Sequence, residues 1–335
     1  MRKREYFMNF GMDEDIVEDV KTKLSYIRSY GTFIGEKNNK IYFEKYKVKN
    51  EKGRIVISHG FTECIEKYKE LIYYFTREGY STFIMEHRGH GRSGCLGYKD
   101  KTQINIEDFN YYIKDFKLFI DKEVLRTNKK KLILFSHSMG GAIGAMFLEK
   151  YPKYFEKAIL SSPMLQIAIG KVPGFLARAI AKTALILGKA NDFILGNIPY
   201  DSTYDFFLAS TSNESRYSYY YREIVGNNKL QRGGGSYKWL YESLKALKYI
   251  LKKENISNIE AEVLVFEAGK DDLIGTDGIR KFVKRCDKGK LIKFKNSKHE
   301  IYLENNYILE RYLDIIFEFL DKNLNAIYIN NIPLT

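Results

Sequence analysis

Ser138 is the residue of this sequence whose surroundings best suit covalent chemistry. It stands in the middle of Ser136-His-Ser-Met-Gly140, after an apolar strand-like run and before an apolar helical pattern. A nucleophilic serine needs this placement, because a sharp strand-to-helix turn exposes its hydroxyl and small neighbours let the strand and helix close together. Ser136 replaces the first glycine of the G-x-S-x-G pattern, which adds modest crowding. The stretch predicts a nucleophile at Ser138.

A serine nucleophile needs a base, and the base needs a carboxylate that orients it. His299 lies in a short polar loop after the last predicted strand, and Asp271 and Asp272 follow the predicted strand 261–267 through another such loop. Loops at the carboxyl edge of a parallel sheet gather reacting groups. The chain order serine, aspartate, histidine is the one expected around a nucleophile in the middle of the sheet. At this level either aspartate fits.

The segment His59-Gly-Phe-Thr-Glu63 follows the predicted strand 54–58 and supplies a third element of such a site. A tetrahedral oxyanion needs two backbone N–H donors. The N–H of Met139, directly after the nucleophile, is one candidate, and the N–H of Phe61 is placed for the second. We interpret His59 and His137 as residues that shape the site rather than as bases.

The loop 86–94 contains three glycines and two histidines, a composition that also occurs in metal and phosphate sites. The spacing of metal ligands is absent, however, and no helix begins at the loop. We therefore interpret it as a structural loop that Arg88 and the glycines hold in place.

These residues need a scaffold, and the apolar pattern predicts one. Short buried strands alternate with helices, which indicates an α/β fold with a mostly parallel sheet covered on both faces. The predicted strands are 40–48, 54–58, 81–85, 131–135, 157–161, 261–267 and 290–294, and the predicted helices are 65–78, 106–125, 140–150, 276–287 and 306–323.

The alternation breaks over residues 163–240, which we interpret as an inserted, mainly helical cap. The segment begins with an apolar helical run, 173–188, in which Pro173 suits the first turn and Gly188 the end. A tyrosine-rich stretch and three consecutive glycines follow. Residues 1–162 and 241–335 then form the core.

The composition limits the partners and the compartment. The net charge of +13 permits peripheral contact with an anionic membrane surface, but no nucleic-acid motif is present. Three widely spaced cysteines suit a reducing compartment, and we find neither a secretory signal nor a membrane-spanning stretch. We expect a cytoplasmic protein that does not bind nucleic acid; its oligomeric state is open.

The same stretches resemble a known family. His59-Gly-Phe61, the loop 86–94, Ser136-His-Ser-Met-Gly-Gly-Ala142, the cap segment 232–239 and Lys298-His-Glu-Ile301 are similar to the lysophospholipase L2 and monoacylglycerol lipase branch of the α/β-hydrolase superfamily. This resemblance implies an α/β-hydrolase fold. It also implies that Ser138 is the nucleophile, Asp271 the orienting acid, His299 the base, and Phe61 and Met139 the oxyanion donors, without metal or cofactor.

The resemblance implies a serine hydrolase that cleaves carboxylic esters of monoacyl lipids through an acyl-enzyme. We keep two alternatives: an aminopeptidase-like enzyme or general carboxylesterase of the same superfamily, and a non-catalytic protein that binds lipid or a membrane surface. Four basic residues of the predicted cap are candidate contacts for a substrate phosphate: Arg222, Lys229, Arg232 and Lys238. A lysine or arginine in such a position is more often an ordinary surface cation.

Overall fold

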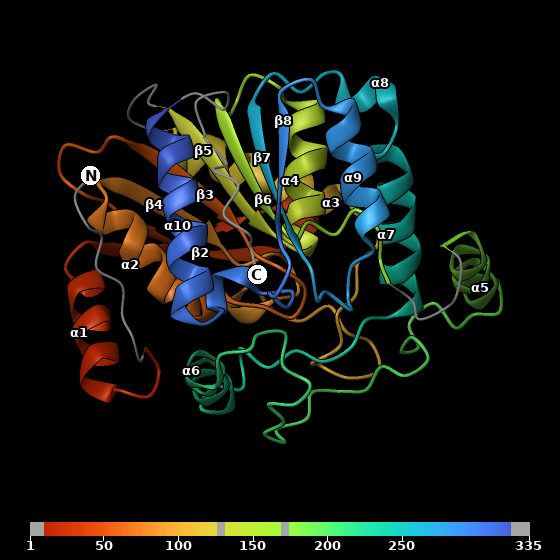
Figure 1. Cartoon of the computed structure of the whole chain (residues 1–335). Coiled ribbons are helices and arrows are strands. Elements are labelled where there is room, and N and C mark those ends of the chain that lie inside the picture. Colours follow the sequence, from red (N-terminus) through yellow and green to blue (C-terminus); the bar gives the residue numbers. More distant parts are fainter. Residues whose placement is uncertain (1–9, 126–130, 169–173, 323–335) are drawn as a thin grey trace.

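An eight-stranded sheet forms the centre of the molecule (Figure 1). The computed structural model describes residues 10–125, 131–168 and 174–322. The strand order is β1-β2-β4-β3-β5-β6-β7-β8; β2 runs antiparallel to β1 and to β4, and the other neighbouring strands are parallel. The strands are β1 (Arg28–Ile34), β2 (Lys40–Tyr46), β3 (Gly53–Ser58), β4 (Tyr80–Met85), β5 (Leu132–His137), β6 (Lys157–Ser161), β7 (Glu262–Ala268) and β8 (Gly289–Phe294).

The seven predicted strands are confirmed to within two residues at each end, and β1 is the strand that the sequence pattern missed. Most of its residues are exposed at the edge of the sheet, so its sequence shows no apolar alternation. The inner strands β3, β4 and β5 are buried along their whole length. Burial on both faces explains why they are apolar without alternation.

Helices cover both faces of the sheet (Figure 1). Alternate residues of one strand enter opposite cores: Leu134 belongs to one apolar cluster, and Ile133 and Phe135 belong to the other. The cluster that contains Ile133 also receives side chains from α1 (Glu14–Ser25), α2 (Lys69–Arg77) and α10 (Asn306–Asp321). The cluster that contains Leu134 receives side chains from α3 (Asn110–Phe119), α4 (Met139–Lys150), α7 (Tyr237–Ile250), α8 (Lys253–Ile256) and α9 (Thr276–Arg285).

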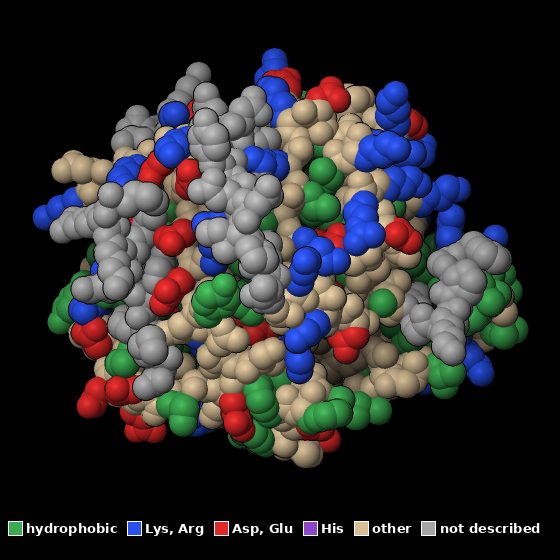
Figure 2. All heavy atoms as spheres, in the orientation of Figure 1, with side chains coloured by type: hydrophobic (Ala, Val, Ile, Leu, Met, Phe, Trp, Pro, Cys, Tyr) green, Lys and Arg blue, Asp and Glu red, His purple; other side chains and the backbone are tan. Residues whose placement is uncertain are grey.

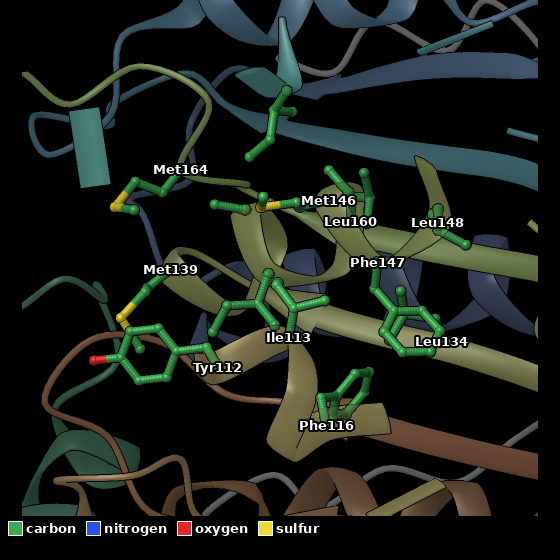
Figure 3. Packing of buried hydrophobic residues seen from close by; sticks show 14 of the residues in the cluster. Tyr112, Ile113, Phe116, Leu134, Met139, Met146, Phe147, Leu148, Leu160 and Met164 are labelled. Atoms are coloured by element: carbon green, nitrogen blue, oxygen red, sulfur yellow. The ribbon is translucent and has the colours of Figure 1, made fainter. Parts of the chain in front are cut away.

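Helix α4 is the element that presents the nucleophile. All of its residues except the last are buried. Figure 3 shows its side chains Met146 and Phe147 packed among Ile113 and Phe116 of α3 and Leu134 of β5. A helix that is apolar all round suits this central position, and its first turn lies beside the carboxyl end of β5.

The segment between β6 and β7 carries α5 (Gly174–Ile186), α6 (Glu214–Val225) and the start of α7. Gly188 ends the α5 turn with a φ of +74°, as predicted, whereas Pro173 lies outside the described residues. The predicted cap boundary at residue 240 falls inside α7, a helix that packs on α4. The division into cap and core stays a prediction. No helix of the described residues combines the length and apolar character needed to cross a membrane.

Candidate active site

Ser138 lies at the turn between β5 and α4 in a strained backbone conformation. Its φ of +52° and ψ of −121° lie in a region that side-chain-bearing residues rarely adopt. The turn is fixed from both sides: the Ser138 N–H donates to the Ser161 carbonyl at 3.2 Å, and the Ser138 carbonyl accepts from the Met164 N–H at 2.8 Å. Ser138 as a whole residue keeps 9% exposure in an otherwise buried turn.

Small residues allow this turn to close. A Cβ at Gly140 would lie 2.1 Å from the Ser58 carbonyl oxygen, so no larger residue fits at that position. Ser136, the departure from the usual motif, is accommodated because α4 presents Gly144 to it; a Cβ there would lie 3.1 Å from the Ser136 Oγ. The Ser136 hydroxyl donates to the Ile159 carbonyl at 3.3 Å. The extra hydroxyl is therefore buried with a partner.

His299 pairs with Asp271 and not with Asp272. Its Nδ1 lies 2.6 Å from the Asp271 Oδ2, and each side chain is only 3% exposed. The other Asp271 oxygen accepts the backbone N–H groups of Leu273 and Ile274, each at 3.0 Å. Asp272 points to solvent. Because a carboxylate only accepts, Nδ1 carries the proton and Nε2 is left as an acceptor.

Two contacts hold the His299 loop against the turn that carries Ser138. The Ser162 hydroxyl donates to the His299 carbonyl at 2.8 Å, and Ser162 follows β6, the strand next to β5. The rings of His299 and His137 are 4.7 Å apart, and His137 directly precedes Ser138. The loops after β5, β7 and β8 thus meet at the carboxyl edge of the sheet.

The loop after β3 approaches Ser138 closely. A Cβ built on Gly60 would lie 3.1 Å from the Ser138 Cβ, so glycine permits the approach. The next residue is Phe61, whose ring packs on Trp239 of α7 with centroids 4.3 Å apart. Among the described residues, the N–H groups of Phe61 and Met139 have no hydrogen-bond partner. Two unpaired N–H groups beside a serine can bind an oxyanion.

A buried acid that sequence reasoning missed supports this loop. Glu63 accepts the Gly60 N–H at 2.5 Å, the Tyr68 hydroxyl at 2.6 Å and the Tyr302 hydroxyl at 3.1 Å. Burial by itself would raise the pKa of Glu63, but the Lys67 ammonium, 3.1 Å away, and the hydrogen bond from the Tyr68 hydroxyl hold that pKa well below its usual range. Glu63 is the last residue of the segment His59-Gly-Phe-Thr-Glu63 that the sequence analysis singled out. Its partner Tyr302 lies 239 residues later in the chain, so the local sequence pattern could not predict their contact.

The same cluster does not suit a metal ion. Among the described residues, Glu63, His137 and Glu300 place ligand atoms within 4.8 Å of one another. Lys67 already pairs with both carboxylates. Its ammonium supplies the positive charge that a cation would otherwise bring.

The histidines behind the loop are neutral. Burial lowers the pKa of His59 to about 4 and that of His137 to about 3. His59 donates from Nδ1 to the Gly60 carbonyl at 2.8 Å and accepts the His87 N–H on Nε2 at 2.9 Å, so its tautomer is set by two backbone groups. These contacts match a shaping role for His59.

Arg88 and the glycines hold the loop 86–94, as predicted. Arg88 pairs with the buried Asp115 at 2.7 Å. Gly91 has a φ of +49°, and a Cβ on it would overlap the Glu86 carboxyl. Arg232, from the segment between β6 and β7, donates to the carbonyls of Gly89, Gly91 and Gly94 at 2.7–2.8 Å. Arg232 is thus committed to this loop and unavailable to a substrate phosphate.

A mostly parallel sheet with this strand order, with a serine on a strained strand-to-helix turn and a histidine–aspartate pair at the same edge, defines the α/β-hydrolase class. The family described as serine aminopeptidase S33 matches residues 49–306, about three quarters of the chain. The chain belongs to this family and is a hydrolase.

Relatives and solved structures agree with this assignment. Lysophospholipase L2 of Escherichia coli K12 is 26% identical over 304 residues, covering 88% of each chain. Monoacylglycerol lipase of Mycolicibacterium smegmatis is 26% identical over 263 residues, covering 78% of this chain and 86% of the relative. A soluble variant of monoglyceride lipase from Saccharomyces cerevisiae, solved with a substrate analog, has the same fold, with a TM-score of 0.68 at 20% identity over 88% of this chain and 94% of its own.

Proposed function

We propose that the chain hydrolyses carboxylic esters of monoacyl lipids, a lysophospholipid or a monoacylglycerol, through an acyl-enzyme on Ser138. The observation that carries the proposal is the buried pair of His299 and Asp271, held at 2.6 Å beside the strained Ser138 turn. A histidine oriented in this way is the base that activates a serine.

In the proposed reaction the Ser138 Oγ attacks the acyl carbonyl, and the His299 Nε2 takes its proton. Asp271 stays ionised and stabilises the imidazolium. The N–H groups of Phe61 and Met139 bind the oxyanion. His299 then protonates the leaving alcohol. Water, deprotonated by the same base, releases the fatty acid.

The substrate class is supported by the relatives and by the cap. The curated relatives named above are a lysophospholipase and a monoacylglycerol lipase. Helix α5 leaves apolar side chains open to solvent, among them Leu176, Ile180 and Ile186. An exposed apolar helix between β6 and β7 suits an acyl chain or the surface of a membrane. We therefore include in the proposal a peripheral contact of the cap with an anionic membrane.

The alternative of an aminopeptidase has less support. An enzyme that binds a substrate ammonium needs a free carboxylate near the nucleophile. The buried carboxylates beside the site, Glu63 and Glu300, are both paired with Lys67.

The cytoplasmic location stays a prediction; the three cysteines are free thiols.

The central test is Ser138→Ala. It should abolish turnover of a long-chain monoacyl ester and labelling by a fluorophosphonate. The matched control is Ser136→Gly, which changes the neighbouring serine and should retain both. Turnover by Ser138→Ala at the wild-type rate would refute the assignment. Parallel assays on an aminoacyl amide separate the esterase from the aminopeptidase.

A further inference from the structure

A hollow in the surface lies away from Ser138 and His299, neither of which lines it. It is an open cleft of about 1300 Å³ among α5, α7, α8 and α9. Its floor is apolar and includes Leu165, Ile167, Leu244, Leu247 and Leu251. A volume of this size is large enough for a lipid headgroup with part of its chains.

Cations dominate the rim of this cleft. Seven lysine and arginine side chains line it, against the two carboxylates of Glu254 and Asp277. In the described ranges, exposed Lys182, Lys248 and Lys281 have no carboxylate within ion-pair distance. Figure 2 shows lysines and arginines gathered over α8 and α9. Unpaired cations around an apolar floor fit an amphiphile with an anionic head.

Helix α5 joins this cleft to the exposed apolar surface of the cap. Ala177 and Ala181 of α5 are buried, and α5 packs against α7. Arg178 and Lys182 line the cleft, while Ile180 is 47% exposed. The helix thus places cations at the cleft and apolar side chains beside it. Helices that lie in a membrane interface have the same arrangement.

The cleft is close to the catalytic loops without being part of them. Its wall continues from Met164, whose N–H donates to the Ser138 carbonyl at 2.8 Å. The same wall includes Gly275, which lies four residues after Asp271 and donates its N–H to the Gln166 carbonyl at 2.9 Å. Beside this contact, Ile167 forms a bridge with Ile274. A lipid in the cleft would hold the active-site edge against a membrane.

We propose that this cleft binds the headgroup of an anionic membrane phospholipid, with the upper parts of its chains on the apolar floor. The inference rests on the membrane contact proposed above and names the surface that makes it. It does not depend on ester hydrolysis.

The test is binding to vesicles of phosphatidylcholine with and without phosphatidylglycerol, measured by sedimentation in the Ser138→Ala background so that no ester is cleaved. The Ser138→Ala parent should bind the anionic vesicles more tightly than the neutral ones. Lys248→Glu with Lys281→Glu should weaken binding to anionic vesicles more than tenfold, and the double glutamine variant should weaken it less.

The matched control is Lys47→Glu with Lys49→Glu, which makes the same change of charge at exposed lysines after β2. This variant should bind within about twofold of its parent, because these lysines lie outside the cleft. Circular dichroism and the unfolding temperature show that each variant is folded. If the Lys47/Lys49 glutamate control loses as much binding as the Lys248/Lys281 glutamate variant, the net charge of the protein and not the cleft is responsible. That result would overturn the proposal. If the parent binds neither vesicle, the membrane contact itself is wrong, while Ser138-dependent hydrolysis stands or falls separately.

Discussion

At the scale of single residues, Asp271 and Asp272 are chemically identical neighbours with different surroundings. Asp271 is buried against His299 and holds two backbone N–H groups, whereas Asp272 is exposed. Burial and direct contact let one carboxylate orient the imidazole, and a solvated neighbour has no such effect.

We therefore expect Asp271→Asn to lower kcat by about 10⁴-fold, because an amide opposite Nδ1 favours the wrong tautomer of His299. Asp272→Asn should change kcat less than about twofold. Steady-state turnover of one ester by both variants checks this. Equal losses in the two variants would show that the base is oriented by another group.

At the scale of elements, an ion pair anchors α6, which lies between β6 and β7, to α2. Arg216 binds Glu70 of α2 with two nitrogens at 2.7 and 2.8 Å and the Glu304 carbonyl at 2.9 Å, and both side chains of the pair are buried. Such a pair fixes one geometry, because its fork-like hydrogen bonds are directional.

Arg216→Met should destabilise the protein by about 3–5 kcal/mol, since it leaves the Glu70 carboxylate buried and uncompensated. Removing both charges with Arg216→Met and Glu70→Gln should cost less than the single change. Urea denaturation measures the loss, and limited proteolysis of the cap measures its local release. A double variant less stable than Arg216→Met would contradict this account.

Helix α4 contains a second buried acid with a different role. Glu149 is 3% exposed, and in the described part of the chain neither carboxyl oxygen has a hydrogen-bond partner. Burial raises the pKa of Glu149 to about 9. The folded chain thus holds this group protonated at neutral pH, whereas the unfolded chain releases the proton above its ordinary pKa of 4.5.

The contribution of Glu149 to stability is complete below pH 4.5 and is lost as the pH rises to about 9. Glu149→Gln removes this titration. Between pH 6 and 9, we expect the free energy of unfolding to fall less for the variant than for the wild type. At pH 9 this difference should amount to about 1–3 kcal/mol in favour of the variant. Urea denaturation across that range is the measurement, and exposed Glu156→Gln is the control. Parallel pH curves for the wild type and Glu149→Gln would rule this out.

At the scale of the whole molecule, neutral histidines are built into the core behind the active site. Burial lowers the pKa values of His59, His87, His90 and His137. In the unfolded chain these groups titrate near 6.5. Between these values the unfolded state binds more protons than the folded state.

Stability should therefore fall by several kcal/mol as the pH drops from about 6.5 toward 4. Glu63 adds to this loss of stability at the low end of the pH range. Because folding lowers the pKa of Glu63, the ionised carboxylate stabilises the fold above its ordinary pKa of 4.5, and this stabilisation is lost as the pH falls below that value. Urea denaturation at pH 7, 5.5 and 4.5 tests the expectation. A free energy of unfolding that stays constant over this range would show that these histidines are charged in the folded protein.

The sequence by itself determined the parts of the protein that depend on short-range patterns. Continuous apolar runs mark the inner strands, because burial on both faces excludes polar residues there. The turn around Ser138 is evident because strand, small residues and helix follow one another within a few positions. The edge strand β1 and helices α1, α6 and α8 were missed, since their exposure or short length leaves a weak pattern. Helix α7 was missed although it has 14 residues and buries one face, because the predicted cap boundary at residue 240 divides it.

Only the tertiary structure showed that His299 contacts Asp271 and not Asp272, that Tyr302 binds Glu63, which supports the Phe61 loop, and that α5, α7, α8 and α9 together form a cationic cleft. In each case the deciding contact joins residues that are far apart in the chain. A side chain's partner across such a distance follows from how the layers pack, and local spacing does not encode it.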